Sequence, residues 1–428
     1  MFALAIALGL FSYWTLTLGV LGMLSLGWIW GGGLVIFGLL LYYKRSDIFS
    51  IRVRKSFWTG LIIGLAAINL IGALGPELGF DALWYHLTIP RIWLLEHKIF
   101  FISGGYFYYS VLPQLGETLY TLGLAVGRAT WAKLLSWVFG LLATYVTYNL
   151  ARKYASPKWS LVAAVVFYSN LVVGWLSITA YVELLRTFFE VLAVYLLVDK
   201  KIYSAAIVLG LAITTKLFAL GTLPIFLVLL LVSKYHWKQL GKFTLLALLV
   251  PLPWFIMAYT STHNPIYPVF SNYNLSSVRS IWDGVTIWFR SPDPLSPVYA
   301  ITFPLIVIFR RKLPLELLIY CILALAVWWV LPHTGGGRFI LPYLPVFSVL
   351  ATLAISHLKD KYLQKILLGI VVGISLLSAG LRAVANYKYL PVILGYQSTA
   401  DFLQHHLSTK FGNNFYYLSD DELKSLYK

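Results

Sequence analysis

The sequence predicts an all-α protein that crosses a membrane many times. Of its 428 residues, 60% are hydrophobic and only 11% are charged, and the mean hydropathy is +0.79. Such a composition excludes a water-soluble globular protein. The net charge of +17 would suit a nucleic-acid binder, but nucleic-acid binders are not this apolar. The single cysteine, Cys321, excludes an intrachain disulfide and a cysteine-rich zinc site.

The apolar runs of the chain have the length of membrane-spanning helices. A hydrocarbon core about 30 Å thick requires about 20 apolar residues in a helix, and about thirteen segments approach that length. They are residues 1–22, 25–43, 56–75, 130–150, 159–176, 181–198, 202–216, 218–232, 243–260, 297–309, 313–331, 339–356 and 364–385. The three shortest, 202–216, 218–232 and 297–309, are expected to be tilted or partly re-entrant.

Basic residues indicate the orientation of the chain, because Lys and Arg near helix ends stay on the cytoplasmic side. They gather in six clusters, within residues 44–55, 152–158, 200–201, 234–242, 310–312 and 359–365. All six fall on one side if 1–22 and 25–43 form a hairpin and if 113–127 does not cross. We therefore expect 113–127 to be an interfacial or re-entrant helix.

This topology divides the chain into a transmembrane bundle, residues 1–385, and a short tail, residues 386–428. The bundle has three outer loops, at 76–129, 261–296 and 332–338. The tail also falls on the outer side, where it is either a small cap or the remnant of a larger domain.

The first outer loop contains polar side chains in an apolar frame. Asp81, Tyr85 and His86 share one face if this segment is a helix along the interface. A carboxylate held there can act as a general base or coordinate a divalent cation. The alternative is a solvated acid with an amphipathic helix behind it. Glu117 precedes a long apolar run, so its carboxylate is expected to be poorly solvated by water.

A second group of ionisable residues begins at the outer end of segment 181–198. Glu183, Arg186 and Glu190 are spaced i, i+3 and i+7 and share one helical face. Ionisable groups inside a membrane turn toward the bundle or a wet cavity. For Arg186 and Glu190, an internal ion pair that fixes helix packing accounts for the two charges as well as a functional role does. Glu183 lies nearest the outer surface, which favours a function.

Two cations are predicted at the outer ends of helices, against the general orientation. Lys216 and Arg338 are candidate ligands for an anion such as a phosphate. The glycines at 335–337 would add backbone N–H groups to such a site. The alternatives are snorkelling for Lys216 and a capping or packing role for Arg338.

In this order, the pieces resemble the membrane-embedded GT-C glycosyltransferases. The nearest branch contains the protein O-mannosyltransferases and the aminoarabinose transferases of lipid A. The resemblance covers residues 56–356, and since each motif is short, it rests on their order. The resembling residues are Asp81, Trp84-Tyr85-His86-Leu87, Pro90, Pro113, Glu117, Tyr181-Val182-Glu183, Lys216, Asn264-Pro265-Ile266-Tyr267-Pro268 and the run from Arg338 to Pro345. The chain departs from the family in having two helices, 1–22 and 25–43, before the segment 56–75 that leads into the Asp81 loop, and in lacking a substantial C-terminal soluble domain.

The resemblance implies transfer of a sugar from a polyprenyl-phosphate carrier to an acceptor at the outer face of the cell membrane, with inversion. Asp81 would be the general base, and Glu183 would orient the acceptor or a metal. Lys216 and Arg338 would neutralise the lipid-linked phosphate as it leaves. The fold implied is a GT-C-like bundle with interfacial helices in the first outer loop.

Further residues complete the expected site. We expect His86 as a third catalytic residue and Arg91 as a third phosphate ligand, with Tyr85, Glu117, Tyr181 and His333 as substrate contacts. A divalent cation, Mg²⁺ or Mn²⁺, is a possible cofactor, held by Asp81 and Glu183 if present. The acceptor, whether lipid, glycan or protein, is open.

Two other classes of protein compete with this interpretation. A lipid or sugar transporter would also place charges inside a helical bundle, but here the charges gather at outer ends. An O-antigen ligase or polymerase also handles lipid-linked sugars, but would centre on large basic outer loops, whereas acids lead the first loop here. Convergence of Asp81, Glu183, Lys216 and Arg338 in one outer cavity would favour the transferase.

Overall fold

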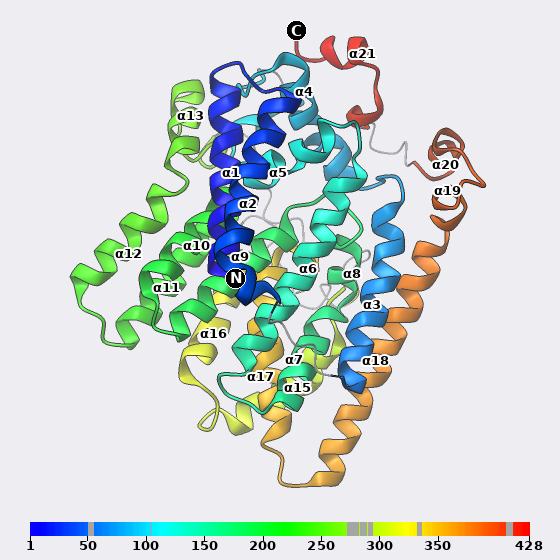
Figure 1. The fold of residues 1–428 in the computed structure, drawn as a ribbon. Helices are drawn as coiled ribbons and strands as arrows, with labels where there is room; N and C mark the ends of the chain where they lie inside the picture. The colour runs from blue at the N-terminus through cyan, green and yellow to red at the C-terminus, as the bar shows by residue number, and fades with distance from the viewer. Residues whose placement is uncertain are drawn as a thin grey trace.

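The computed structural model is a bundle of helices (Figure 1). It describes residues 1–49, 55–103, 105–271, 282, 289, 294–331, 336–407 and 414–428, with the side chains of 45–49 left aside. Within this part of the chain there is no strand, which agrees with the predicted all-α class. Most of the predicted outer loop 261–296, and residues 332–335 with His333, lie outside it.

The helices follow the apolar runs of the sequence. They are α1 (Phe2–Val20), α2 (Leu26–Phe49), α3 (Phe57–Leu74), α4 (Thr88–Glu96), α5 (Leu115–Leu124), α6 (Thr130–Ala151), α7 (Pro157–Tyr168), α8 (Leu171–Leu176), α9 (Glu183–Val198), α10 (Ile202–Thr215), α11 (Thr222–Val232), α12 (Trp237–Leu249), α13 (Leu252–Thr262), α15 (Pro297–Phe309), α16 (Leu315–Val330), α17 (Leu344–Ser356), α18 (Lys361–Tyr387), α19 (Leu390–Ile393), α20 (Thr399–His406) and α21 (Asp420–Lys424). Short turns are the π-turn η1 (Ala82–His86) and the 3₁₀ turns η2 (Tyr108–Val111), η3 (Leu217–Gly221), η4 (Gly337–Phe339), η5 (Leu341–Tyr343) and η6 (Phe415–Tyr417).

Fewer helices than predicted are long enough to cross a membrane alone. Within the described residues, five pass on length and composition, namely α1, α2, α3, α6 and α18, and a sixth if α12 and α13, bent by 61°, form one span. The predicted count of about thirteen is therefore not confirmed. The predicted spans 202–216 and 218–232 contain α10 and α11, of 14 and 11 residues, and the predicted span 243–260 is divided at Pro251 between α12 and α13. Each of these helices is shorter than a hydrocarbon core requires.

Helix α9 lies at the centre of the bundle, where it packs against α6 and α10. Most of its side chains are buried, including the charged Glu183, Arg186 and Glu190. A helix that is buried on all faces is typical of the core of a large bundle. The polar groups on α9 therefore face protein partners.

Helices α1 and α2 form the predicted hairpin. Its turn is hydrogen-bonded to the segment after α4, because the Leu24 N–H donates to the His97 carbonyl (3.2 Å) and the Ile99 N–H to the Gly19 carbonyl (3.1 Å). A Cβ at Gly32 of α2 would lie 2.0 Å from the Trp14 indole nitrogen of α1, so close approach of the two helices requires glycine there. The hairpin turn thus lies at the same end of the bundle as α4.

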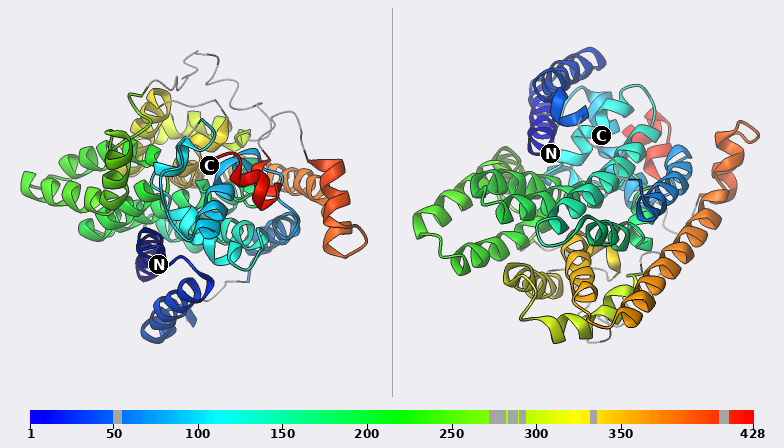
Figure 2. Two further views of the ribbon diagram at one scale, coloured as in Figure 1. Left: turned by 90° about the horizontal axis from the view of Figure 1, so that it is seen from above. Right: turned by 60° about the horizontal axis from the view of Figure 1, so that its bottom comes forward.

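The first outer loop and the basic loops lie at opposite ends of the molecule. In Figure 1, α4 and α5 are at the top, and the α6–α7, α15–α16 and α17–α18 connections are at the bottom. Helix α5 has 10 residues, a length of about 15 Å, and cannot cross a hydrocarbon core. Seen from above, the C-terminal segment lies over the region of α4 and α5 (Figure 2). The upper end of the bundle is therefore built from short elements.

Candidate active site

A cavity of about 480 Å³ opens among η1, α5, the α10–η3 junction and η4. Its volume is within the usual range for small-molecule sites. Apolar and aromatic side chains supply most of the wall. The polar side chains that line it are Asp81, Tyr85, His86, Tyr108, Tyr109, Gln114, Glu117, Thr215, Lys216 and Arg338. Most of these come from the first outer loop, and the two cations come from distant segments of the chain.

Asp81 and Arg338 form an ion pair at the cavity wall. The Arg338 Nη1 donates to the Asp81 Oδ2 at 2.5 Å. Asp81 immediately precedes the π-turn η1, and its backbone N–H donates to the Tyr181 hydroxyl at 3.0 Å. The Arg338 guanidinium lies over the rings of Phe339 (4.8 Å to the centroid) and Tyr181 (5.6 Å). Both charges are thus held by rigid neighbours.

Glu183 and Lys216 form a second ion pair beside the first. The Lys216 Nζ donates to the Glu183 Oε1 at 2.6 Å, where the Glu183 side chain is 2% exposed and that of Lys216 is 17% exposed. Lys216 has an extended backbone at the end of α10, so the helix stops where its side chain enters the cavity. Glu183 is the first residue of α9, at the positive end of the helix dipole, which favours a carboxylate.

The two ion pairs form one electrostatic cluster. Burial alone would lower the pKa of the Arg338 guanidinium, but the carboxylates of Asp81 and Glu183 outweigh it and raise that pKa above its usual range. Arg338 therefore interacts with both acids, and not with Asp81 alone. Of the four residues that the sequence singled out, Asp81, Lys216 and Arg338 line one cavity, and Glu183 lies behind Lys216 as its partner.

His86 and Glu117 form a third pair in the same wall. The His86 Nδ1 and the Glu117 Oε1 are 2.5 Å apart, and both residues are buried. The remaining atoms of the pair, His86 Nε2 and Glu117 Oε2, have no hydrogen-bond partner in the described part of the chain, and the same holds for Glu183 Oε2. Buried polar atoms normally find a partner, so these three are available to a bound molecule.

Aromatic rings close one side of the cavity. The Tyr85 ring stacks on that of Tyr109 with centroids 4.3 Å apart, and Trp84 meets both rings edge to face. Tyr181 lies deeper, where it contacts Asp81 and Arg338 as described above. Stacked rings of this kind supply a flat apolar surface next to the charged groups.

The fold of the chain is similar to that of solved structures. Two crystal structures of ArnT from Cupriavidus metallidurans are similar to it. The apo structure matches with a TM-score of 0.54 at 17% identity, over 84% of this chain and 75% of that one. The structure bound to undecaprenyl phosphate matches over the same shares, with a TM-score of 0.50 at 16% identity. The chain shares the fold of ArnT.

This likeness confirms the fold that the resemblance in sequence predicted. No protein-family model matches the sequence, and a search of curated proteins finds no significant match. The short motifs, in their order along the chain, therefore carried a signal that overall sequence similarity did not.

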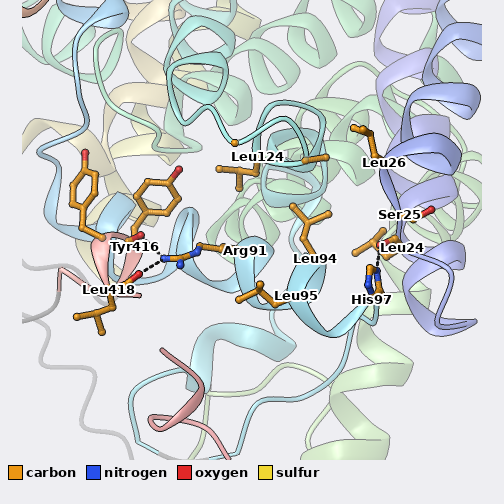
Figure 3. A pocket seen from close by; sticks show the side chains of 13 residues that line it. Leu24, Ser25, Leu26, Arg91, Leu94, Leu95, His97, Leu124, Tyr416 and Leu418 are labelled. Atoms are coloured by element: carbon orange, nitrogen blue, oxygen red, sulfur yellow. Dashed lines mark hydrogen bonds between the residues drawn. The ribbon is translucent and has the colours of Figure 1, made fainter. Parts of the chain in front are cut away.

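Arg91, which was predicted as a third phosphate ligand, does not line this cavity. It lies on α4 and lines a separate hollow beside the α1–α2 turn (Figure 3). Its guanidinium donates to the carbonyls of Tyr416 (2.6 Å) and Leu418 (2.8 Å) and to the Asp420 carboxylate (2.5 Å). Ten residues beyond Asp81, the chain has turned away from the site. Arg91 instead binds the C-terminal segment, and His333 lies outside the described residues.

Asp81 and Glu183 are the two residues predicted to hold a divalent cation. In the part of the chain that the structure describes, no group of three or more His, Cys, Asp or Glu side chains is arranged to hold one. Each of the two acids has a cation as its neighbour.

Two buried residues that the sequence analysis did not select fix the loop that carries Asp81. The Glu77 carboxylate accepts the N–H groups of Leu78 (2.9 Å), Gly79 (2.7 Å) and Ala180 (2.6 Å). The buried Lys133 Nζ donates to the carbonyls of residues 75 and 76, at 2.7 and 2.8 Å. Lys133 is an isolated cation in a predicted span, and that signal could have revealed it. Both residues join the Asp81 loop to the bundle.

Proposed function

We propose that the chain is a glycosyltransferase that moves a sugar from a polyprenyl-phosphate carrier to an acceptor hydroxyl, with inversion. The observation that supports this most is the meeting of Asp81, Lys216 and Arg338 in one cavity, with Glu183 paired to Lys216 behind its wall, at the end of a bundle with the fold of ArnT. One of the two similar ArnT structures has undecaprenyl phosphate bound. A carrier lipid that stays in the bilayer requires such a cavity at membrane depth.

Asp81 is the general base of the proposed reaction. Its carboxylate takes the proton of the acceptor hydroxyl as the acceptor oxygen bonds to the anomeric carbon. The bond from that carbon to the phosphate oxygen breaks, and the electron pair leaves with the carrier phosphate. Asp81 ends protonated and the carrier gains one negative charge, so proton and charge balance. Positioned bases of this kind contribute about 10²–10⁴-fold to a rate.

Arg338 and Lys216 stabilise the leaving phosphate. The negative charge on the carrier grows in the transition state, and fixed cations in a partly dry cavity act on it without reorganisation. The Arg338 guanidinium offers two parallel N–H groups, which match the geometry of a phosphate. Glu183 orients Lys216, and the proposal routes no step through a metal.

His86, Glu117 and Tyr85 are proposed to contact the sugar and the acceptor. The unpartnered His86 Nε2 and Glu117 Oε2 can bond to hydroxyl groups. The Tyr85 ring, stacked on Tyr109, offers a flat face to a sugar ring.

The proposed site faces the outer side of the cell membrane. The support is the separation of the first outer loop from the basic connections at the other end of the bundle (Figure 1), together with the positive-inside rule. Single cysteines placed at Phe101 and Lys238 test this, because a membrane-impermeant thiol reagent should label the first in intact cells and spare the second.

The proposed activity is tested by incubating the purified protein with radiolabelled polyprenyl-phosphate sugars and membrane lipid, glycan and peptide acceptors. Transfer should depend on Asp81 and should be absent in Asp81→Asn. The matched control is Asp420→Asn, which removes an acid paired with an arginine outside the cavity. If no polyprenyl-phosphate sugar is consumed or bound, the proposal fails. Carrier translocation without transfer would favour a flippase.

A further inference from the structure

Both cations of the cavity are already paired with carboxylates. Arg338 Nη1 is 2.5 Å from Asp81 Oδ2, and Lys216 Nζ is 2.6 Å from Glu183 Oε1. The formal charges of these four groups add to zero. A phosphate that binds the same cations has to compete with the two acids for the same N–H groups.

The pairing also opposes the proposed role of Asp81. The Asp81 Oδ2 already accepts a hydrogen bond from Arg338 Nη1, so this oxygen is occupied where the proton of a hydroxyl would have to arrive. A base is most effective when its partner is withdrawn before the proton moves. The ligand-free arrangement is therefore suited to neutralise charge in the cavity, and less suited to activate a hydroxyl.

We propose that the phosphate of the donor replaces Asp81 and Glu183 as the partner of Arg338 and Lys216, and that this exchange releases Asp81 to act as the base. This inference rests on the proposed function. In the structure, the two carboxylates accept the N–H groups that the phosphate would take. Asp81 can then accept a proton only while the carrier lipid is bound.

The surroundings of the cations suit such an exchange. Arg338 lies over the rings of Phe339 and Tyr181, and Lys216 Nζ is 5.8 Å from the centroid of Phe339. Both cations therefore lie beside the same ring and line the same cavity, where one phosphate would meet both. Their aromatic contacts do not depend on the carboxylates, so the cations can keep their places when the anion changes.

The Asp81 side chain can turn without a change in the backbone. The Asp81 backbone is held through its N–H by the Tyr181 hydroxyl, so only the side chain has to turn away from Arg338. Glu183 has one oxygen, Oε2, with no hydrogen-bond partner in the described part of the chain. An acid in a closed network would lose more bonds on exchange.

The experiment measures the affinity of undecaprenyl phosphate for the purified protein in four forms: wild type, Asp81→Asn, Arg338→Ala and the double variant. If the exchange occurs, Asp81→Asn abolishes transfer. The same variant should bind undecaprenyl phosphate about tenfold more tightly than wild type, because the phosphate no longer competes with a carboxylate for the charge-assisted hydrogen bond of Arg338. In the Arg338→Ala background, Asp81→Asn should change the affinity less than twofold, because there is no cation to compete for.

Two controls sharpen the result. Undecaprenol, which lacks the phosphate, should bind Asp81→Asn and wild type alike. Asp420→Asn, at the Arg91 pair outside the cavity, should leave the affinity for undecaprenyl phosphate unchanged. Should Asp81→Asn fail to fold, Glu183→Gln with Lys216→Ala provides the same cycle at the second pair.

The outcomes separate the two proposals. Absence of undecaprenyl phosphate binding by the wild-type protein overturns the proposed function and the exchange together. Binding by wild type without tightening in Asp81→Asn overturns the exchange alone. Equal tightening in the presence and absence of Arg338 also overturns it, because general repulsion between the acid and the phosphate would then explain the effect.

Discussion

Helix α9 carries two ion pairs that look alike in the sequence and differ in the structure. Near its middle, Arg186 Nε binds Glu190 Oε1 at 2.5 Å. Glu190 Oε2 accepts from the Thr222 hydroxyl at 2.9 Å, so both oxygens of this acid are satisfied. At the start of the helix, Glu183 binds Lys216 and leaves Oε2 without a partner in the described residues.

The difference separates a structural pair from a functional one. A buried acid whose oxygens are all bonded fixes the packing of its neighbours, and losing one partner leaves an isolated buried charge. A buried acid with an open oxygen beside a cavity has capacity for a ligand. The following changes test that distinction, beginning with the strongest.

Asp81→Asn should have the largest effect, on the reaction and not on the fold. Removing a positioned base should lower transfer by about 10²–10⁴-fold, while the variant elutes as a single species and unfolds at the wild-type temperature. Glu183→Gln should also be impaired, but less severely. Initial rates with a polyprenyl-phosphate sugar measure both. Transfer by Asp81→Asn within a few-fold of wild type would remove Asp81 from the role of base.

Arg186→Ala should lower the free energy of unfolding strongly, whereas the cavity variants should lower transfer and leave the stability unchanged. It leaves the Glu190 carboxylate buried among α9 neighbours without its cation, which typically costs about 3–5 kcal/mol. Thermal unfolding in detergent measures the loss. Replacing both partners, as Arg186→Met with Glu190→Leu, should recover most of it. If Arg186→Ala stays stable but fails to bind carrier lipid, the distinction drawn on α9 is wrong.

Arg338→Ala should lower the affinity for the donor, by less than Asp81→Asn lowers the rate of transfer. A charge-assisted hydrogen bond is worth about 1.5–3 kcal/mol, which corresponds to about one to two powers of ten in affinity or kcat/KM. Arg338→Lys should recover only part, since an ammonium lacks the planar two-pronged geometry. Lys216→Ala should weaken the same donor, and the double variant should be less than additive if both cations touch one phosphate. Unchanged donor affinity in Arg338→Ala would return Arg338 to a packing role.

The charged residues of the site were predictable because each interrupts an apolar run. Asp81, Glu183, Lys216 and Arg338 stand where a membrane segment begins or ends, and a charge there is costly without a purpose. Their pairing was not predictable. Arg338 lies 257 residues from Asp81, and Lys216 lies 33 residues from Glu183, so only the packed bundle decides which acid meets which cation.

The same limit applies to Arg91 and to the number of spans. Arg91 is close to Asp81 in sequence, but a short helix sends its side chain to another face, a direction that residue type does not encode. The predicted number of spans is not confirmed, because runs such as 202–216 and 218–232 form helices of 14 and 11 residues, shorter than a hydrocarbon core requires. Hydropathy measures where a segment is apolar, and not where its helix ends.

The smallest effect is expected at the pair that lies outside the cavity. Arg91 and Asp420 are joined at 2.5 Å, with side chains 21% and 55% exposed. Exposed ion pairs contribute about 0–1 kcal/mol, so Asp420→Asn should lower the Tm by about 2 °C or less. Arg91→Ala also removes the donors to the Tyr416 and Leu418 carbonyls, which water can replace.

Both variants should bind undecaprenyl phosphate within twofold of wild type, because neither residue lines the cavity of Asp81. A tenfold loss in Arg91→Ala, with no loss in Asp420→Asn, would instead place Arg91 on the path of the phosphate. The prediction from sequence would then be right, and the pair with the C-terminal segment would be a resting contact.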